Sequence, residues 1–259
     1  MMNIHEIPLL EYDDTSKEII SPDHDWKGGP LPEKCLFAFL GEELHKYAAT
    51  NNAAVAGVLR SIFHDVTVYV IRQGNEEFCL VQAPLGAPVA VSVLDTLISC
   101  GCRKIIATGS CGVLTDIEEN VFILPKKALR DEGTSYHYLP AERYIELDRE
   151  PAAVIRKTFR KMNLPVLECS TWTTDGFFRE TEEKVTRRLK EGCSVVEMEC
   201  AALAACSRKR GAKFGQFLFT ADSLANVHVY DARDFGRASR EKALLLGLEI
   251  LAEWSENDS

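Results

Sequence analysis

The stretch "KIIATGSCGVL", residues 104–114, sets the frame for the whole chain. A short apolar run leads into Gly109, Ser110, Cys111 and Gly112, after which the apolar run resumes. Glycines let a backbone turn sharply and bring its N–H groups close to an anion or a sugar hydroxyl. The pattern predicts a buried strand over 104–108 that ends in a ligand-binding turn at 109–112, with Ser110 as a hydroxyl donor. A glycine-rich turn without a ligand is an equally good interpretation of this motif alone.

Similar apolar runs alternate with helical stretches along the rest of the chain. They predict strands over 35–40, 66–71, 78–83, 104–108, 121–124, 166–172, 194–198 and 214–220. Helices are predicted over 42–50, 52–62, 87–100, 151–162, 180–191, 199–210 and 237–256. This alternation predicts an α/β fold of three layers, with a central mixed sheet between helices. Residues 1–33 are acidic and punctuated by Pro and Gly, so we expect an irregular extension there and a single domain over 34–259.

Composition excludes several classes of function. The 259 residues carry a formal net charge of −9, which disfavours nonspecific binding to nucleic acid or to an anionic membrane. The nine cysteines are odd in number and stand mostly in apolar runs, which is typical of reduced, buried thiols. Cys100 and Cys102 lack a second pair at zinc-site spacing, so no metal is expected. The N-terminal segment is unlike a signal peptide and no apolar run reaches the ~20 residues that cross a bilayer, so we expect a cytoplasmic protein.

Carboxyl groups follow two of the predicted strands, at the place where open α/β sheets bind ligands. The segment "SVVEMECAAL" (194–203) carries Glu197, Met198 and Glu199. A carboxylate there is suited to accept hydrogen bonds from vicinal sugar hydroxyls, although a helix cap or a surface charge is the alternative. The segment "FGQFLFTADSL" (214–224) carries Asp222 behind an apolar strand. Apolar surroundings raise the pKa of a carboxyl group and suit it to general acid catalysis, with an N-cap role as the alternative.

Two further segments are candidates for ligand recognition. In "TWTTDGFFRET" (171–181), Phe177 and Phe178 would form a stacking wall for a planar ring, unless they are core aromatics. The segment "RDEGTSYHY", which runs from Arg130 to Tyr138, concentrates polar and aromatic side chains in a predicted loop. Such a loop indicates either recognition or a solvated surface.

Taken in this order and spacing, "GSCG", "TTDGFF", "VEMECAAL" and "TADSL" resemble the nucleoside phosphorylase family. That family includes bacterial hexameric purine nucleoside phosphorylases, uridine phosphorylases and methylthioadenosine nucleosidases. The resemblance covers the chain from about residue 35 onward. It implies a partly barrel-like mixed sheet flanked by helices, an assembly as a homodimer or homohexamer, and an enzyme of purine salvage without a metal or redox cofactor.

The resemblance also implies a role for each matched residue. Asp222 resembles the aspartate that protonates the purine at N7 as the glycosidic bond breaks. Glu199 resembles the glutamate that binds the ribose 2′- and 3′-hydroxyls, and Met198 the residue that packs beneath the sugar. Phe177 resembles the aromatic residue that stacks near the base. The base site is expected to include Val196 and Glu197 as well, and Ser110, with Gly41 and His45, is expected at the phosphate or nucleophile site.

The sequence departs from the family where phosphate would bind. Phosphate-using members place an arginine two residues before the first glycine of the turn, and here that residue is Ala107. They place a second arginine at the fourth position after an early glycine. The matching glycine here is Gly41, and His45 stands at the position of that arginine. A change from arginine to alanine removes a charge and a bidentate donor. His45 substitutes only when protonated.

Two interpretations of the departure remain open. In the first, inorganic phosphate is the co-substrate and an arginine from elsewhere binds it; candidates are Arg60, Arg72, Arg130 and a neighbouring subunit. In the second, water replaces phosphate, with Glu42 or Glu43 as its activating base. The sequence before the turn favours a phosphorylase that yields the free base and ribose 1-phosphate, with a nucleosidase second. Uridine phosphorylase-type specificity and a non-catalytic nucleoside-binding homologue are further alternatives.

Overall fold

The computed structural model describes residues 4–62 and 64–255. Its strands are β1 (Lys34–Ala38), β2 (Ala54–Leu59), β3 (Val66–Gln73), β4 (Glu76–Gln82), β5 (Lys104–Val113), β6 (Phe122–Asp131), β7 (Tyr144–Glu146), β8 (Leu167–Thr174), β9 (Cys193–Glu197) and β10 (Lys213–Ser223). Its α-helices are α1 (Glu42–Thr50), α2 (Ala87–Ser99), α3 (Arg149–Lys161), α4 (Glu182–Lys190), α5 (Cys200–Lys209) and α6 (Arg240–Glu253). Short 3-10 helices are η1 (Pro8–Leu10), η2 (Thr134–His137), η3 (Phe177–Arg179) and η4 (Arg237–Ser239).

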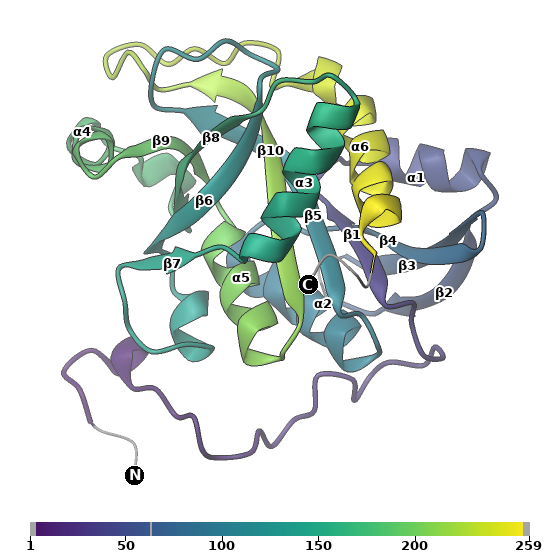
Figure 1. The fold of residues 1–259 in the computed structure, drawn as a ribbon. Coiled ribbons are helices and arrows are strands. Elements are labelled where there is room, and N and C mark those ends of the chain that lie inside the picture. Colours follow the sequence, from purple (N-terminus) through teal and green to yellow (C-terminus); the bar gives the residue numbers. More distant parts are fainter. Residues whose placement is uncertain (1–3, 63, 256–259) are drawn as a thin grey trace.

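The strands form one mixed sheet that partly closes on itself. Their order is β10-β6-β8-β9-β5-β1-β4-β3-β2, and β7 pairs with β6. Because β10 also pairs with β5 in parallel, the strands β5, β10, β6, β8 and β9 close into a five-stranded barrel, which β1, β4, β3 and β2 extend as an open sheet (Figure 1). The predicted α/β fold with a mixed, partly barrel-like sheet is therefore confirmed.

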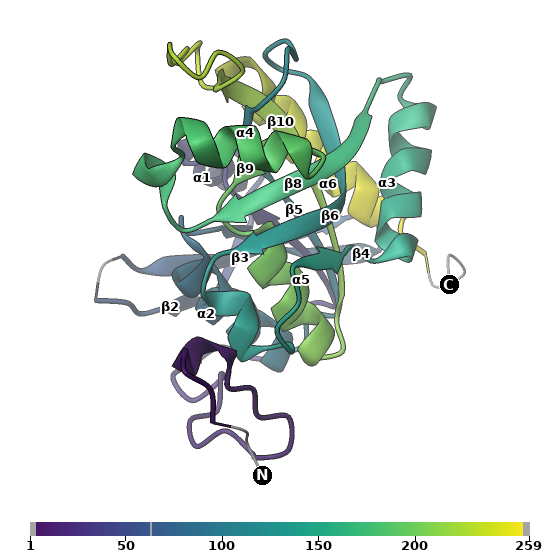
Figure 2. The ribbon, with the colours of Figure 1, turned by 90° about the vertical axis from the view of Figure 1, so that its left-hand side faces the viewer.

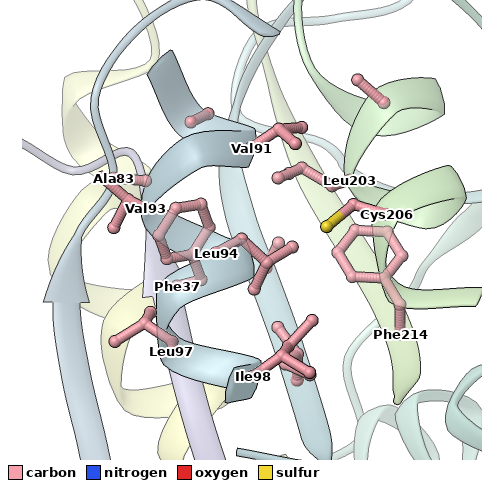
Figure 3. Close-up of a cluster of buried hydrophobic side chains, with 14 of the residues drawn as sticks. Phe37, Ala83, Val91, Val93, Leu94, Leu97, Ile98, Leu203, Cys206 and Phe214 are labelled. Atoms are coloured by element: carbon pink, nitrogen blue, oxygen red, sulfur yellow. The ribbon is translucent and has the colours of Figure 1, made fainter. Parts of the chain in front are cut away.

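Helices cover the sheet on both faces. Leu44 of α1, Phe159 of α3 and Leu244 of α6 share one buried core with alternate residues of β1, β5 and β10. Helices α2 and α5 pack on the other face, where Leu94 of α2 and Leu203 of α5 belong to one buried cluster with Phe37 of β1 and Phe214 of β10 (Figure 3). Figure 2 shows α4 lying across β8 and β9. The central strands are apolar along their whole length, for example β1 with all five residues buried. Because successive side chains point to opposite faces, such strands support a core on each face.

The predicted helix over 52–62 is wrong. Residues 54–59 form β2, which pairs antiparallel with β3, and Val55 lies opposite Tyr69. The alanines of this segment suggested a helix, but Asn52 adopts a left-handed backbone (φ 52°), which ends α1. The ring of Trp26 lies against Gly57, where an added Cβ would stand 2.5 Å from it. Tertiary pairing therefore overrides the local helix propensity.

The predicted turn at 109–112 is also wrong, because β5 continues through it to Val113. Its residues pair with β10 and β9; for example, Ser110 lies opposite Phe219, and Gly112 opposite Val196. The glycines are needed for close packing instead of for a turn. A Cβ on Gly109 would stand 2.9 Å from the Cβ of Phe39, and one on Gly112 would stand 3.1 Å from both Leu224 and Val196.

Other element boundaries differ in smaller ways. Strand β6 runs on from the predicted 121–124 to Asp131, with a register shift after Pro125, and β7 was not predicted. Strand β10 extends to Ser223, so Asp222 lies in a strand and is not a helix cap. The remaining predicted helices agree with α1 to α6 to within three residues at each end.

Residues 4–33 run along the lower ends of α2 and α5 (Figures 1 and 2). The Leu31 N–H donates to the Cys100 carbonyl, and the Thr96 hydroxyl donates to the Pro22 carbonyl. Lys209 of α5 forms an ion pair with Asp14. Among these residues the structure assigns one regular element, η1. The boundary at residue 33 between an N-terminal extension and a single domain stays a proposal.

Candidate active site

A cavity of about 350 Å³ opens where β1, β5, β9 and β10 end. We call it the acidic cavity, because Glu180, Glu197, Glu199 and Asp222 line it together with aromatic and small residues. The full lining is Phe39, Leu85, Gly109, Ser110, Cys111, Gly112, Phe177, Phe178, Glu180, Val196, Glu197, Met198, Glu199, Gln216, Leu218, Asp222 and Phe235. Seven residues expected at the site from sequence therefore meet here: Ser110, Phe177, Val196, Glu197, Met198, Glu199 and Asp222.

Glu197, the last residue of β9, is held by four protein donors. One oxygen, Oε2, accepts hydrogen bonds from the backbone N–H groups of Glu199 (2.8 Å) and Cys200 (2.6 Å), at the start of α5. The other, Oε1, accepts from the hydroxyls of Thr173 (2.6 Å) and Thr171 (3.2 Å). Burial raises the pKa of Glu197, and these donors oppose that shift. Its carboxyl group thus caps α5 and ties it to β8, and its expected contact with a base stays a prediction.

Glu199, the N-cap residue of α5, reaches toward a second helix. Its Oε1 accepts a 2.6 Å hydrogen bond from the backbone N–H of Gly86, the N-cap of α2. The side chain is 6% exposed, and burial, followed by the charge of Glu197, raises its pKa to about 8. A carboxylate has about four acceptor sites, so capacity remains for the two hydroxyls of a sugar.

Asp222 lies near the end of β10 beside two other titratable groups. It is 8% exposed, and burial raises its pKa, although a hydrogen bond from Tyr230 and the charge of Arg233 oppose the shift. Burial and the neighbouring Asp222 raise the pKa of Glu180 to about 7. The pKa of Tyr230 is raised to about 12 for the same reasons. Burial thus favours protonated carboxyl groups at this end of the cavity.

An aromatic wall stands at the mouth of the cavity. The rings of Phe177 and Phe178 meet edge to face, with centroids 4.9 Å apart. They are 43% and 90% exposed, so neither is a core residue. Together with Glu180 and Phe235 they also line an adjoining cavity of about 440 Å³.

Two residues of the expected nucleophile site lie outside the acidic cavity. Gly41 and His45 line a separate cavity of about 440 Å³ with His64 and Gln82, and the acidic cavity shares Leu85 with it. The His45 ring nitrogen Nδ1 lies 3.1 Å from the Tyr69 hydroxyl. Glu42 lines that second cavity too, and Glu43 pairs with Lys46, so neither candidate base lines the acidic cavity.

The candidate arginines also lie elsewhere. Arg60 pairs with Asp65, and Arg72 with Glu77. Arg130 is buried and donates to the Ser135 hydroxyl and to the carbonyls of Leu139 and Pro140. None of these arginines, nor any other residue of the loop 130–138, lines the acidic cavity. The described lining in fact includes no Lys, Arg or His.

Several lining residues were not identified from the sequence. Glu180 stood in a charged run that is typical of a solvated helix start, and Phe39, Leu85 and Phe235 gave no signal beyond their apolar character. Gln216 did give a sequence signal, since it is the only amide in the apolar run "FGQFLFTA". Across residues 4–62 and 64–255, no group of three or more His, Cys, Asp or Glu side chains is arranged to hold a metal ion. Within the same residues no helix has the length and apolar character needed to cross a membrane.

Curated relatives match about half of the chain and about half of their own length. An uncharacterized protein, R802, of Acanthamoeba polyphaga mimivirus is 29% identical over 150 residues, which is 55% of this chain and 56% of that protein. A guanosine phosphorylase of Halorubrum lacusprofundi is 24% identical over 132 residues, which is 51% of this chain and 55% of that protein.

Solved structures share the fold over most of the chain. An AMP nucleosidase from Bacteroides thetaiotaomicron superposes with a TM-score of 0.70 at 22% identity, over 88% of this chain and 90% of that one. A purine nucleoside phosphorylase from Toxoplasma gondii superposes with a TM-score of 0.72 at 14% identity, over 86% of this chain and 91% of that one. The family model of the phosphorylase superfamily matches residues 34–252. The chain therefore belongs to the phosphorylase superfamily.

Proposed function

We propose that this chain is an enzyme that cleaves the N-glycosidic bond of a purine nucleoside. The observation that carries the proposal is the meeting of Asp222 and Glu199, two buried carboxyl groups with raised pKa values, in one cavity whose mouth carries Phe177. Nucleoside phosphorylases and a nucleosidase are among the proteins it resembles, and both classes act on this bond.

The chemistry of the bond explains why these side chains suit it. Breaking the bond between C1′ and N9 builds positive charge on the ribose and negative charge on the base. Asp222, whose pKa burial raises, donates its proton to N7 in this proposal and neutralises the leaving base. Because uracil has no N7, this role favours a purine. Phe177 stacks on the base, and Phe178 closes the same side.

Glu199 holds the sugar in this proposal, with Met198 packed beneath it. Two hydrogen bonds from the 2′- and 3′-hydroxyls favour the ionised form of a carboxyl group, as does positive charge that develops on the ribose. Both effects lower the pKa of Glu199 from about 8 as the reaction proceeds. The carboxylate therefore stabilises the transition state more strongly than the ground state.

The acceptor of the ribosyl group is either phosphate or water. Ser110, which lines the acidic cavity beside two glycines, supports phosphate, the acceptor that the family resemblance favours. A phosphate dianion also needs a cation, and Lys, Arg and His are absent from the described lining. Phosphorolysis therefore requires a positive charge that a neighbouring subunit supplies, which ties it to the expected homodimer or homohexamer.

A nucleoside panel tests the proposed function. The purified chain is incubated with adenosine, inosine, guanosine, methylthioadenosine and uridine, each with and without inorganic phosphate, and the free base is measured by chromatography. We expect release of purine base and little or no uracil. Uracil release at a comparable rate would refute the purine assignment. No release from any nucleoside would refute an enzyme and favour the non-catalytic homologue. Light scattering of the same preparation measures the oligomeric state.

A further inference from the structure

Gln216 is a buried amide whose carbonyl oxygen has no partner among residues 4–62 and 64–255. It lies in the middle of β10, is 1% exposed and lines the acidic cavity. Its Oε1 makes no hydrogen bond within the described part of the chain. An unsatisfied buried polar atom costs stability, so such a group calls for a partner that the protein itself does not supply.

The register of the sheet puts Gln216 beside the residue that departs from the family. Gln216 lies directly opposite Ala107 in the parallel pair of β10 and β5, so both side chains point to the same face. The resemblance predicts an arginine at position 107, and the residue that faces Ala107 from the neighbouring strand is a neutral amide.

Gln216 and Asp222 line the acidic cavity from different positions along β10. The two residues are six positions apart on β10, and both line the cavity. In an extended strand that separation exceeds the length of a Gln side chain several times. If Asp222 protonates the leaving base, the separation along β10 sets Gln216 apart from that base, in a part of the cavity from which a nucleophile can approach C1′.

The charges of the cavity favour a neutral nucleophile. Its described lining has four carboxyl groups and no cation, so a phosphate dianion would enter without a counter-charge. An amide both donates and accepts hydrogen bonds, and Ser110 lines the same cavity. A bound water needs two to four polar partners, and the Gln216 amide supplies a donor and an acceptor toward them.

On the basis of the proposed function, we propose that the Gln216 amide holds a water molecule that attacks C1′, so that the chain hydrolyses its nucleoside. The water oxygen forms a bond to C1′ while the bond from C1′ to N9 breaks. The electron pair of that bond stays on the base, which takes the Asp222 proton at N7. The water loses one proton to solvent, from which Asp222 regains a proton before the next turnover. The products are a free purine and free ribose.

The first test identifies the acceptor. The purine nucleoside that the panel shows to be cleaved fastest is incubated in ¹⁸O-labelled water, with and without phosphate. We expect the same rate in both conditions and labelled free ribose as the sugar product. Base release that requires phosphate and yields ribose 1-phosphate would overturn the inference and leave the proposed function intact. No base release at all would refute the proposed function itself.

The second test assigns the role to Gln216. In Gln216→Leu, the side chain keeps a similar size but loses both hydrogen-bonding groups. We expect kcat to fall by at least about ten-fold with KM changed less than two-fold. We also expect thermal stability to be kept, and thermal unfolding measures it, since Oε1 of Gln216 makes no hydrogen bond within the described residues. Thr108→Val is the matched control. Thr108 is a buried β5 residue whose Oγ1 also lacks a partner in the part of the chain that the structure describes, but it does not line the cavity, so turnover should stay within two-fold. An unchanged kcat in Gln216→Leu would overturn the assignment.

Discussion

Strands β9 and β10 both carry buried polar groups into the acidic cavity, but the protein satisfies their hydrogen bonds very differently. At the end of β9, Glu197 accepts four hydrogen bonds from threonine hydroxyls and backbone N–H groups. On β10, the Gln216 oxygen has no described partner, and Asp222 has a raised pKa with a tyrosine hydroxyl beside it. A buried polar group whose hydrogen bonds the protein supplies serves the fold, whereas one with spare hydrogen-bonding capacity is available to a ligand. We therefore expect Glu197 at the end of β9 to serve mainly the fold, and Gln216 and Asp222 of β10 to serve mainly the reaction.

The largest effect is expected at the β10 end, for Asp222→Asn. An amide of the same shape has no acidic proton, so we expect kcat for a purine nucleoside to fall by about 10² to 10⁴. Stability should change little, since Asp222 is not part of a dense hydrogen-bond network. Steady-state kinetics and thermal unfolding measure the two quantities. In the parent enzyme, activity should fall as the pH rises through the raised pKa of Asp222, because only the protonated form is a proton donor. Equal rates for the variant and the parent would contradict this role.

The opposite balance is expected at the β9 end, for Glu197→Ala. The change removes the acceptor of four buried hydrogen bonds and uncaps α5. We expect the free energy of unfolding to fall by about 3 kcal/mol, since several buried donors lose their partner at once. Urea denaturation followed by circular dichroism measures this loss. Glu183→Ala is the control, because Glu183 is an exposed residue of α4, and its loss should stay within about 0.5 kcal/mol. A small loss for Glu197→Ala would show that the network is dispensable.

Glu199 is expected to affect both activity and folding, and its contribution to the free energy of unfolding should depend on pH. Burial raises its pKa from 4.5 to about 8, so the folded protein keeps a proton that the unfolded chain releases. The stability that this group contributes is fully present below about pH 4.5 and is lost as the pH rises through about 8. We expect Glu199→Gln, which stays neutral, to exceed the parent by about 2 kcal/mol at pH 8.5 and to equal it near pH 4.5. Urea denaturation at both pH values measures the difference. A difference independent of pH would mean that Glu199 is ionised in the free protein.

The sequence predicts most of the helices and strands, because the pattern of apolar residues within each one indicates its type. It misassigns β2 and the second half of β5, where pairing between distant segments decides the structure. The glycines of β5 suggested a turn, but they serve close contacts with Phe39 and Val196 that only the folded chain reveals.

Some residues of the site could likewise be predicted from the sequence, and others could not. Asp222 and Glu199 stand at strand ends, where the topology brings polar groups together, so their meeting follows from their position in sequence. Glu180 and Gln216 become noticeable only through burial and a missing partner, which no local pattern encodes. Gly41 and His45 resemble a phosphate motif in sequence, but they line a second cavity, which shares Leu85 with the acidic cavity.

The smallest expected effect concerns the aromatic wall, which belongs to neither strand end. Phe177→Ala removes the ring that is expected to stack on the base, and a single base stack is worth roughly 1–3 kcal/mol. We therefore expect kcat/KM to fall by about ten-fold, mainly through KM, because stacking acts on the ground state and the transition state alike. Phe178→Ala is the matched comparison. That ring is 90% exposed and touches Phe177 edge to face, so its loss should cost about two-fold. If Phe178→Ala costs more than Phe177→Ala, the base lies toward the adjoining cavity that both rings line, and the stacking assignment passes from Phe177 to Phe178.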